Sequence, residues 1–179
     1  MNTITVSGKA GSGKTTVAKS LSESLGLKYL SMGRIFRDLA KDEGISLSEF
    51  SKHAETDKDI DFKIDEKQKE YAKKGNIVIE GRLSGHIIDN ADLKIWLDAS
   101  LSERVNRIIG RENRSYDDVF EETKIREMSE KKRYYKYYQI DIDDLRAYDV
   151  VINTQKWNAN DIVEIIKNMY SKLGGKSND

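Results

Sequence analysis

The sequence has 179 residues, a length typical of one domain that buries a sizeable core without cross-links. Its 31 basic residues balance 31 acidic ones, so no overall charge favours nucleic acid or a membrane surface, and the absence of cysteine excludes disulfides, thiol catalysis and cysteine-zinc sites. No signal peptide is visible, and no apolar stretch reaches the roughly 20 residues that span a membrane. We therefore expect a cytoplasmic protein that binds neither nucleic acid nor membrane, and we expect it to be a monomer.

Five short apolar runs, separated by long charged segments of helical period, predict a parallel α/β sheet. Each run is rich in Ile, Val, Leu or Tyr and is short enough to be a strand buried on both faces. The runs cover residues 4–7, 28–31, 77–80, 93–97 and 150–153. Between the first two runs, Val17, Leu21 and Leu25 are spaced four apart on one face of a predicted helix, which Gly26 is placed to end.

Two of the connections are long enough to be insertions. Residues 34–74 are polar, lack a strand signal, and contain Ser46 followed by Glu49, the capping-box start of a helix. Residues 104–138 are densely charged, and we expect a short lid at 107–136. An amphipathic helix closes a single domain of residues 1–173, and we expect residues 174–179 to be a disordered tail.

The glycine-rich stretch GKAGSGKTT, residues 8–16, predicts a phosphate-binding loop of the Walker A type. Gly8, Gly13, Lys14 and Thr15 satisfy the pattern G-x-x-x-x-G-K-[ST], with a strand before it and a helix after it. Glycines let backbone amides turn toward phosphate oxygens, and the lysine neutralises the outer phosphates. The Thr15 hydroxyl is placed to bind Mg²⁺. The expected triphosphate-binding residues are Gly8, Lys9, Ala10, Gly11, Ser12, Gly13, Lys14, Thr15 and Thr16. This pattern alone does not choose among GTPase, ATPase, motor and kinase.

Residues after the third apolar run favour phosphoryl transfer over hydrolysis. The Asn-Lys-x-Asp signature of GTPases is missing. The run ends in Glu80, and hydrolytic ATPases normally carry an acidic residue at the end of an apolar strand. Here, however, Gly81 and Arg82 follow the acid directly. An arginine at the strand ends of an open α/β sheet suggests that a second anion binds beside the triphosphate.

Arginine spacing supports transfer as well. Arg104, Arg107 and Arg111 share one helix face, and Arg126 and Arg133 share another, so the guanidiniums converge if the two helices face each other. Phosphoryl transfer requires charge neutralisation and exclusion of water, which arginines on a covering segment provide. The alternative is a solvated helix pair, because glutamates are interspersed with these arginines.

Taken in order, these segments resemble nucleoside monophosphate kinases over nearly the full chain. The carriers of the resemblance are the loop GKAGSGKT and the segments SMGRIFR, EGR, NADLKIWLDAS, NRIIGRE and IRE...KKRY. Within that family, VIEGRLSG, DLKIWLDAS and IDEKQKE are similar to the compact archaeal type of cytidylate kinase. The resemblance implies a P-loop NTPase-type three-layer fold with helices on both faces of the sheet. Residues 34–74 would then bind the acceptor nucleotide.

The resemblance also implies residue roles. Arg37, Gly81 and Arg82 would bind the acceptor monophosphate, and Asp65 would lie near the acceptor nucleotide. Arg107 and Arg111 would contact the ATP phosphates, and Arg126 and Arg133 would close onto both nucleotides. The loop at 153–157 would lie against the ATP base. The implied catalytic residues are Lys14, Arg82, Arg126 and Arg133.

The chain departs from bacterial cytidylate kinases at two positions. Leu83 stands where those kinases usually have an acid after the EGR arginine, and Arg34 stands where they commonly have an acid after the glycine. The expected activity is ATP-dependent, Mg²⁺-assisted phosphorylation of CMP, and of dCMP as a possible second acceptor, to the diphosphate with release of ADP. CMP as acceptor rests on the resemblance, not on a hydrogen-bond pattern in the residues.

Several alternatives stay open at this point. The acceptor could instead be AMP, UMP, shikimate or dephospho-coenzyme A, or the protein could be a non-catalytic, ATP-responsive nucleic-acid-binding module that uses the run RYYKYYQ to stack bases. We interpret these tyrosines as packing the lid helix on the body, with their hydroxyls in solvent. We interpret His53 and His86 as structural, because neither has a partner at metal-ligand spacing and a phosphate acceptor needs no general base. Trp96 is expected in the core, and Trp157 is a candidate to touch a base.

Overall fold

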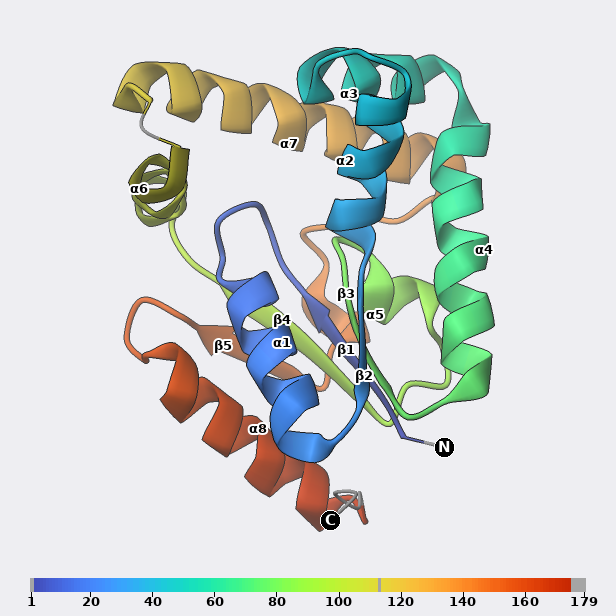
Figure 1. Ribbon diagram of the computed structural model, residues 1–179, viewed down its shortest axis with the longest axis vertical. Helices are drawn as coiled ribbons and strands as arrows, with labels where there is room; N and C mark the ends of the chain where they lie inside the picture. The colour runs from blue at the N-terminus through green and yellow to red at the C-terminus, as the bar shows by residue number, and fades with distance from the viewer. Residues whose placement is uncertain (1, 113, 175–179) are drawn as a thin grey trace.

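A sheet of five parallel strands organises the protein, in a computed structural model that describes residues 2–112 and 114–174 (Figure 1). The order across the sheet is β2 (Lys28–Ser31), β3 (Ile77–Glu80), β1 (Thr3–Ser7), β4 (Leu93–Asp98) and β5 (Val150–Asn153). The five predicted strands are confirmed, with β1 beginning one residue earlier and β4 ending one residue later than predicted. In the central pairings Val6 lies opposite Glu80 of β3 and opposite Ile95 of β4.

Helices cover both faces of the sheet, which explains why the strands contain few charged residues and why apolar residues stand next to each other in β3 and β4. On one face α1 (Lys14–Leu25) and α8 (Ala159–Lys172) pack together over a core that includes Val78. On the other face Ile77 and Ile79 pack in a second core with α4 (Lys58–Lys74). Ile87 of the short helix α5 (Ser84–Ile87) packs against the same core. The predicted α/β three-layer architecture is therefore confirmed.

Helix α1 follows the phosphate loop as predicted. Val17, Leu21 and Leu25 are all buried on the sheet side. Gly26 ends the helix in the left-handed conformation, with φ of 62°. The loop is thus attached to a helix that is packed along its length.

The two long connections are helical. Residues 34–74 fall in α2 (Met32–Asp42), α3 (Leu47–Thr56) and α4, and the capping box of Ser46 and Glu49 opens α3 as predicted. The second connection consists of α6 (Leu101–Glu112) and α7 (Tyr116–Tyr138), followed by a single 3-10 turn at Leu145–Ala147. Figure 1 shows α7 running across one end of the molecule beside α3, to which it is packed. Whether 34–74 and 107–136 act as acceptor-binding insertion and lid remains a prediction.

The tyrosines of the RYYKYYQ run mostly pack α7 against its neighbours. Tyr134 is buried, and Tyr135 is exposed. The Tyr137 hydroxyl donates to the Glu55 carbonyl at 2.7 Å, and the Tyr138 hydroxyl donates to the Asp65 carboxylate. The expectation that these hydroxyls reach solvent was wrong for Tyr137 and Tyr138, because α3 and α4 supply acceptors at this interface.

Trp96 is buried in the core, as predicted. Within the described residues, no helix combines the length and apolar character needed to cross a membrane. Helix α8 ends at Lys172, and of the predicted tail 174–179 only Gly174 is described; residues 175–179 lie outside the described residues.

Candidate active site

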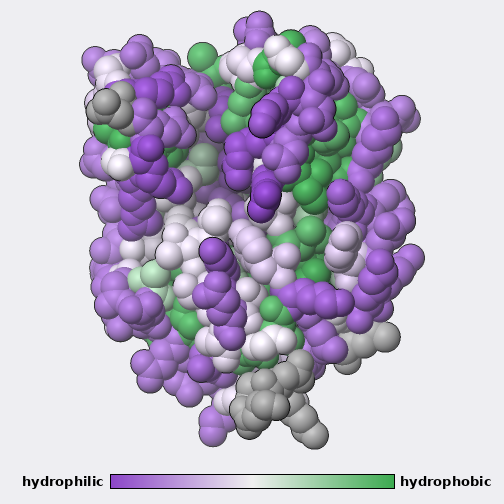
Figure 2. All heavy atoms as spheres, in the orientation of Figure 1, coloured by the Kyte–Doolittle hydropathy of each residue, from purple (hydrophilic) through white to green (hydrophobic). Residues whose placement is uncertain are grey.

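A cavity of about 380 Å³ lies at the carboxyl end of the sheet. Its walls come from the phosphate loop, from the residues that follow β3, and from helices α2, α4, α6 and α7. Figure 2 shows a hollow between the α6 side and the α2 side of the molecule, with largely hydrophilic side chains around it. Ligands of open α/β sheets bind at this end of the strands.

The phosphate loop forms the floor of the cavity. Gly8 has φ of +148°, and a Cβ placed there would lie 2.3 Å from the Leu97 carbonyl oxygen, so only glycine fits. Gly13 is the N-cap of α1 and has no side chain to satisfy the first amides of the helix. Those amides and the helix dipole therefore favour an anion at this point.

Other loop residues divide between the cavity and its surroundings. Ala10, Gly11, Lys14 and Thr15 line the cavity. The Ser12 hydroxyl is buried with no hydrogen-bond partner in the described structure. The Lys9 side chain turns away to Asp143, with Nζ 2.8 Å from Oδ1, and Thr16 is exposed outside the cavity lining.

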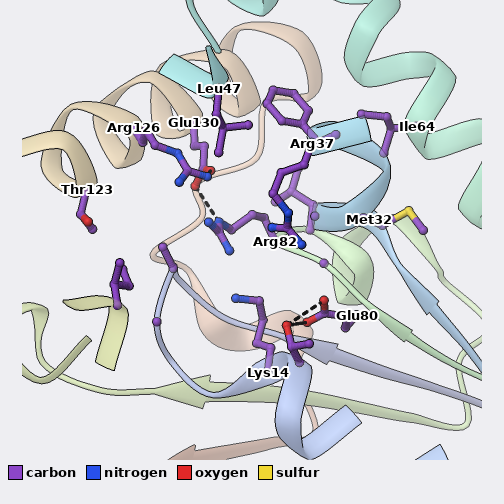
Figure 3. A pocket seen from close by; sticks show the side chains of 18 of the residues that line it. Lys14, Met32, Arg37, Leu47, Ile64, Glu80, Arg82, Thr123, Arg126 and Glu130 are labelled. Carbon is purple, nitrogen blue, oxygen red and sulfur yellow. Dashed lines mark hydrogen bonds and ion pairs between the residues drawn. The ribbon is translucent and has the colours of Figure 1, made fainter. Parts of the chain in front are cut away.

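Lys14 enters the cavity from the start of α1 (Figure 3). Lys14 is only 7% exposed, and its Nζ donates to the Lys9 carbonyl at 2.8 Å. Burial, and then the positive charge of Arg82, hold the pKa of Lys14 well below its usual value. A bound polyphosphate would reverse that effect, because it brings negative charge to a cation that has lost its water.

Glu80 lies beside the phosphate loop, although no role was predicted for it from the sequence. The Thr15 hydroxyl lies 3.1 Å from both of its carboxylate oxygens, and Glu80 also accepts from the Ser31 hydroxyl and, at 3.4 Å, from the Tyr29 hydroxyl. Glu80 is 3% exposed. The sequence shows that Glu80 is an acid at the end of a strand. It does not show that this strand, β3, pairs directly with β1 and so places Glu80 beside the phosphate loop.

Arginines form the opposite wall of the cavity. Arg37 reaches in from α2, Arg82 from the residues after β3, and Arg126 from α7 (Figure 3). Glu130 lies among them: Arg82 Nε donates to Glu130 Oε2 at 2.8 Å, and Arg126 is 4.0 Å from Oε1. Although burial acts to raise the pKa of Glu130, Arg82 and Arg126 hold it below the usual range. Gly81, predicted to contact the acceptor, also lines this wall.

The arginines of α6 do not all converge on the cavity as predicted. Arg111 lines it, but Arg104 is buried below it and donates to the carbonyls of Ala99 and Ala10, both at 3.0 Å, and to Glu127 of α7. Arg104 therefore joins α6, α7 and the phosphate loop. The reason is the facing carboxylate of Glu127, which helical periodicity alone does not reveal.

Arg107 lies at the edge of the site rather than in the cavity lining. Its guanidinium donates to the side-chain and main-chain oxygens of Thr154, both at 2.8 Å. Arg107 NH1 would also be 3.8 Å from a Cβ placed at Gly13. The predicted loop at 153–157 is thus held beside the phosphate loop, with Trp157 half exposed.

Neither histidine lines the cavity, in agreement with the interpretation of both as structural residues. His53 is exposed and its Nδ1 is 3.8 Å from Glu43. His86 packs edge-on against Tyr148. In the described part of the chain, no group of three or more His, Asp or Glu side chains could hold a metal ion unaided.

Together the fold and the site define a P-loop phosphotransferase, with a phosphate loop facing an arginine cluster across one cavity. The sequence model of the cytidylate kinase-like family matches residues 3–156, and the chain belongs to this family.

Relatives support that membership, and solved structures share the fold. Cytidylate kinases from Pyrococcus horikoshii and Archaeoglobus fulgidus are 51% and 50% identical to this chain; the matches cover 92% and 91% of it and 85% and 91% of those proteins. The fold is similar to an uncharacterized protein from Eubacterium ventriosum, with a TM-score of 0.73, 20% identity, and coverage of 96% and 99%. It is also similar to shikimate kinase from Acinetobacter baumannii, with a TM-score of 0.64, 17% identity, and coverage of 96% and 94%.

Proposed function

We propose that the protein transfers the γ-phosphoryl group of ATP to the phosphate of CMP, and also of dCMP, producing the diphosphate and ADP. The observation that carries the proposal is the single cavity in which Lys14 and the phosphate loop face Arg37, Arg82 and Arg126. Two phosphate-binding walls around one space suit transfer between two nucleotides. The cytidylate kinase relatives supply CMP as the acceptor.

In this proposal the protein acts by position and charge. Lys14 and the loop amides hold the ATP phosphates, and Arg37 and Arg82 hold the acceptor phosphate. Arg126, beside Arg82 on the arginine wall, would stabilise charge on the group in transit. The acceptor phosphate is already ionised at neutral pH, so no side chain must remove a proton.

The helices α6 and α7 would complete the site. Arg111 already lines the cavity and would contact the ATP phosphates together with Arg107 from the rim. Arg133 would contact the acceptor nucleotide. Closure of these helices would exclude water, so that transfer competes with hydrolysis.

The residues present fit Mg²⁺ on the ATP phosphates. Mg²⁺ binds oxygen ligands and usually takes only one or two from protein, with the rest from phosphates and water. Thr15 Oγ1 and the Glu80 carboxylate, 3.1 Å apart, provide such oxygens. When bound, the ion would neutralise charge on the β- and γ-phosphates.

An acceptor panel tests the proposed function. With ATP as donor, we expect CMP and dCMP to give the highest kcat/KM for ADP formation, above UMP and AMP, and shikimate and dephospho-coenzyme A to give none. If UMP, AMP, shikimate or dephospho-coenzyme A reacted faster than CMP, that compound would replace CMP as the proposed acceptor. Binding to single-stranded RNA in a salt-dependent gel shift, with no transfer to any monophosphate, would favour the nucleic-acid-binding alternative.

Glu80→Gln tests the proposed metal role. We expect Mg²⁺ affinity, measured as the Mg²⁺ concentration for half-maximal rate, to weaken by about 10- to 100-fold, because the amide keeps the shape but not the charge of the carboxylate. The exposed Glu164→Gln on α8 is the matched control and should leave the Mg²⁺ titration unchanged. An unaltered titration in Glu80→Gln would remove Glu80 from the metal site.

We further propose that the enzyme works as a monomer in the cytoplasm; the lack of cysteine fits a reducing compartment. Light scattering after gel filtration should give a mass near the 20.5 kDa of one chain. A dimer mass would contradict the monomer.

A further inference from the structure

One face of α4 carries polar side chains into the acceptor end of the cavity. Asp61, Asp65 and Gln68 are spaced four and three residues apart, all line the cavity, and all are buried. Ile64, on the same side of the helix, also reaches toward the cavity (Figure 3). Buried polar atoms normally have hydrogen-bond partners, so an atom on this face that lacks one needs a physical explanation.

The orientation of the Gln68 amide is fixed by Asp65. Gln68 Nε2 donates to Asp65 Oδ1 at 2.7 Å, and the other Asp65 oxygen accepts from the Tyr138 hydroxyl. A carboxylate only accepts, so the NH₂ group of Gln68 must face it. The carbonyl oxygen of Gln68 then points away from Asp65; it is buried and has no hydrogen-bond partner in the described structure.

Arg133 presents the complementary group on the same wall. Its guanidinium carbon lies 5.4 Å from the centre of the Phe36 ring, and NH1 is 3.6 Å from Asp61 Oδ2. That distance is an ion pair rather than a hydrogen bond, and Nε and NH1 of Arg133 lack hydrogen-bond partners among the described residues. Asp61 therefore balances the charge of Arg133 while Nε and NH1 keep unpaired N–H groups.

An unpaired acceptor and unpaired donors, both buried in one cavity, indicate a ligand with the opposite pattern. Leaving such groups unpaired in a buried site costs free energy, so a ligand that pairs them gains affinity and specificity. Cytosine offers an exocyclic amine beside a ring nitrogen and a carbonyl oxygen that both accept. Uracil has a carbonyl in place of the amine, which would face the Gln68 carbonyl.

We infer that Gln68 distinguishes cytosine from uracil, by accepting a hydrogen bond from the exocyclic amine while Arg133 donates to the ring nitrogen and carbonyl. Asp65 is the positioning residue that keeps the Gln68 amide in the orientation that accepts. The inference rests on the proposed function, which places a nucleoside monophosphate in this cavity. It assigns the choice of base to α4, separate from the phosphate contacts of Arg37 and Arg82.

Two variants and one control test this inference. Gln68→Met removes the acceptor at similar size, and we expect the ratio of kcat/KM for CMP over UMP to fall by about 10- to 100-fold, mostly through CMP. Asp65→Asn can donate to the Gln68 carbonyl and so lets the amide turn its NH₂ group to the base. Because that group can donate to the uracil carbonyl, we expect this variant to gain activity on UMP as it loses activity on CMP. Glu66→Gln makes the same charge change at the neighbouring exposed position and should keep the wild-type ratio.

The outcomes separate this inference from the proposed function. If wild-type protein shows no preference for CMP, the proposed acceptor fails and the inference fails with it. If wild type prefers CMP but both variants lower CMP and UMP activity equally, the inference alone is overturned. Thermal melting checks folding, and if Gln68→Met does not fold, the direction of the change in Asp65→Asn decides the result.

Discussion

Lys14→Ala is expected to abolish phosphoryl transfer while the protein stays folded. The substitution removes the one cation that the phosphate loop directs into the cavity, and we expect kcat/KM to fall by at least about 10²- to 10³-fold. Because burial disfavours the charged form of Lys14 in the ligand-free protein, its removal should leave the melting temperature unchanged or higher. ADP formation and thermal melting measure the two effects.

The exposed Lys19→Ala on the same helix is the control and should keep full activity. Near-wild-type turnover in Lys14→Ala would show that the triphosphate site is assigned incorrectly. A large loss of stability would show instead that Lys14 is mainly structural.

Arg82→Met should lower both activity and stability. Loss of its proposed contact with the acceptor phosphate, and so of the charge it contributes beside the reacting oxygen, is expected to reduce kcat/KM by about 10³- to 10⁵-fold. Its ion pair with the buried Glu130 is also lost. An unpaired buried carboxylate is costly, so we expect the free energy of unfolding to fall by up to about 3 kcal/mol, with Arg126 compensating in part. Chemical denaturation measures this change.

A double variant separates the two effects of Arg82. Arg82→Met combined with Glu130→Gln should recover much of the stability, because no carboxylate is left unpaired, but none of the activity. Recovery of turnover in the double variant would mean that Arg82 only supports the fold.

The sheet could be predicted from the sequence because its central strands β1, β3 and β4 are buried on both faces. Ile77, Val78 and Ile79 alternate between two cores, which makes the strand a continuous apolar run. The phosphate loop was equally predictable, because its glycines are required by local geometry such as the approach of Gly8 to Leu97.

The parts of the site that were missed depend on neighbours distant in the chain. Glu80 gains its role from β1 beside it, and Arg104 is diverted by Glu127, which is 23 residues away. The Gln68 amide is oriented by Asp65, which in turn accepts a hydrogen bond from Tyr138 across the α4–α7 interface. Periodicity places residues on a helix face, but it does not reveal what lies opposite them.

The pairing of β1 with β3 has a consequence for how the two phosphates are brought together. Val6, two residues before the loop begins, lies opposite Glu80, two residues before Arg82. The proposed donor and acceptor supports, the phosphate loop and Arg82, therefore leave the sheet from adjacent strands at the same level, about 4.8 Å apart. The separation of these strand ends is set by the backbone pairing of β1 with β3 in the central layer of the protein. Movement of the outer helices can regulate access and charge without changing the distance between these two supports.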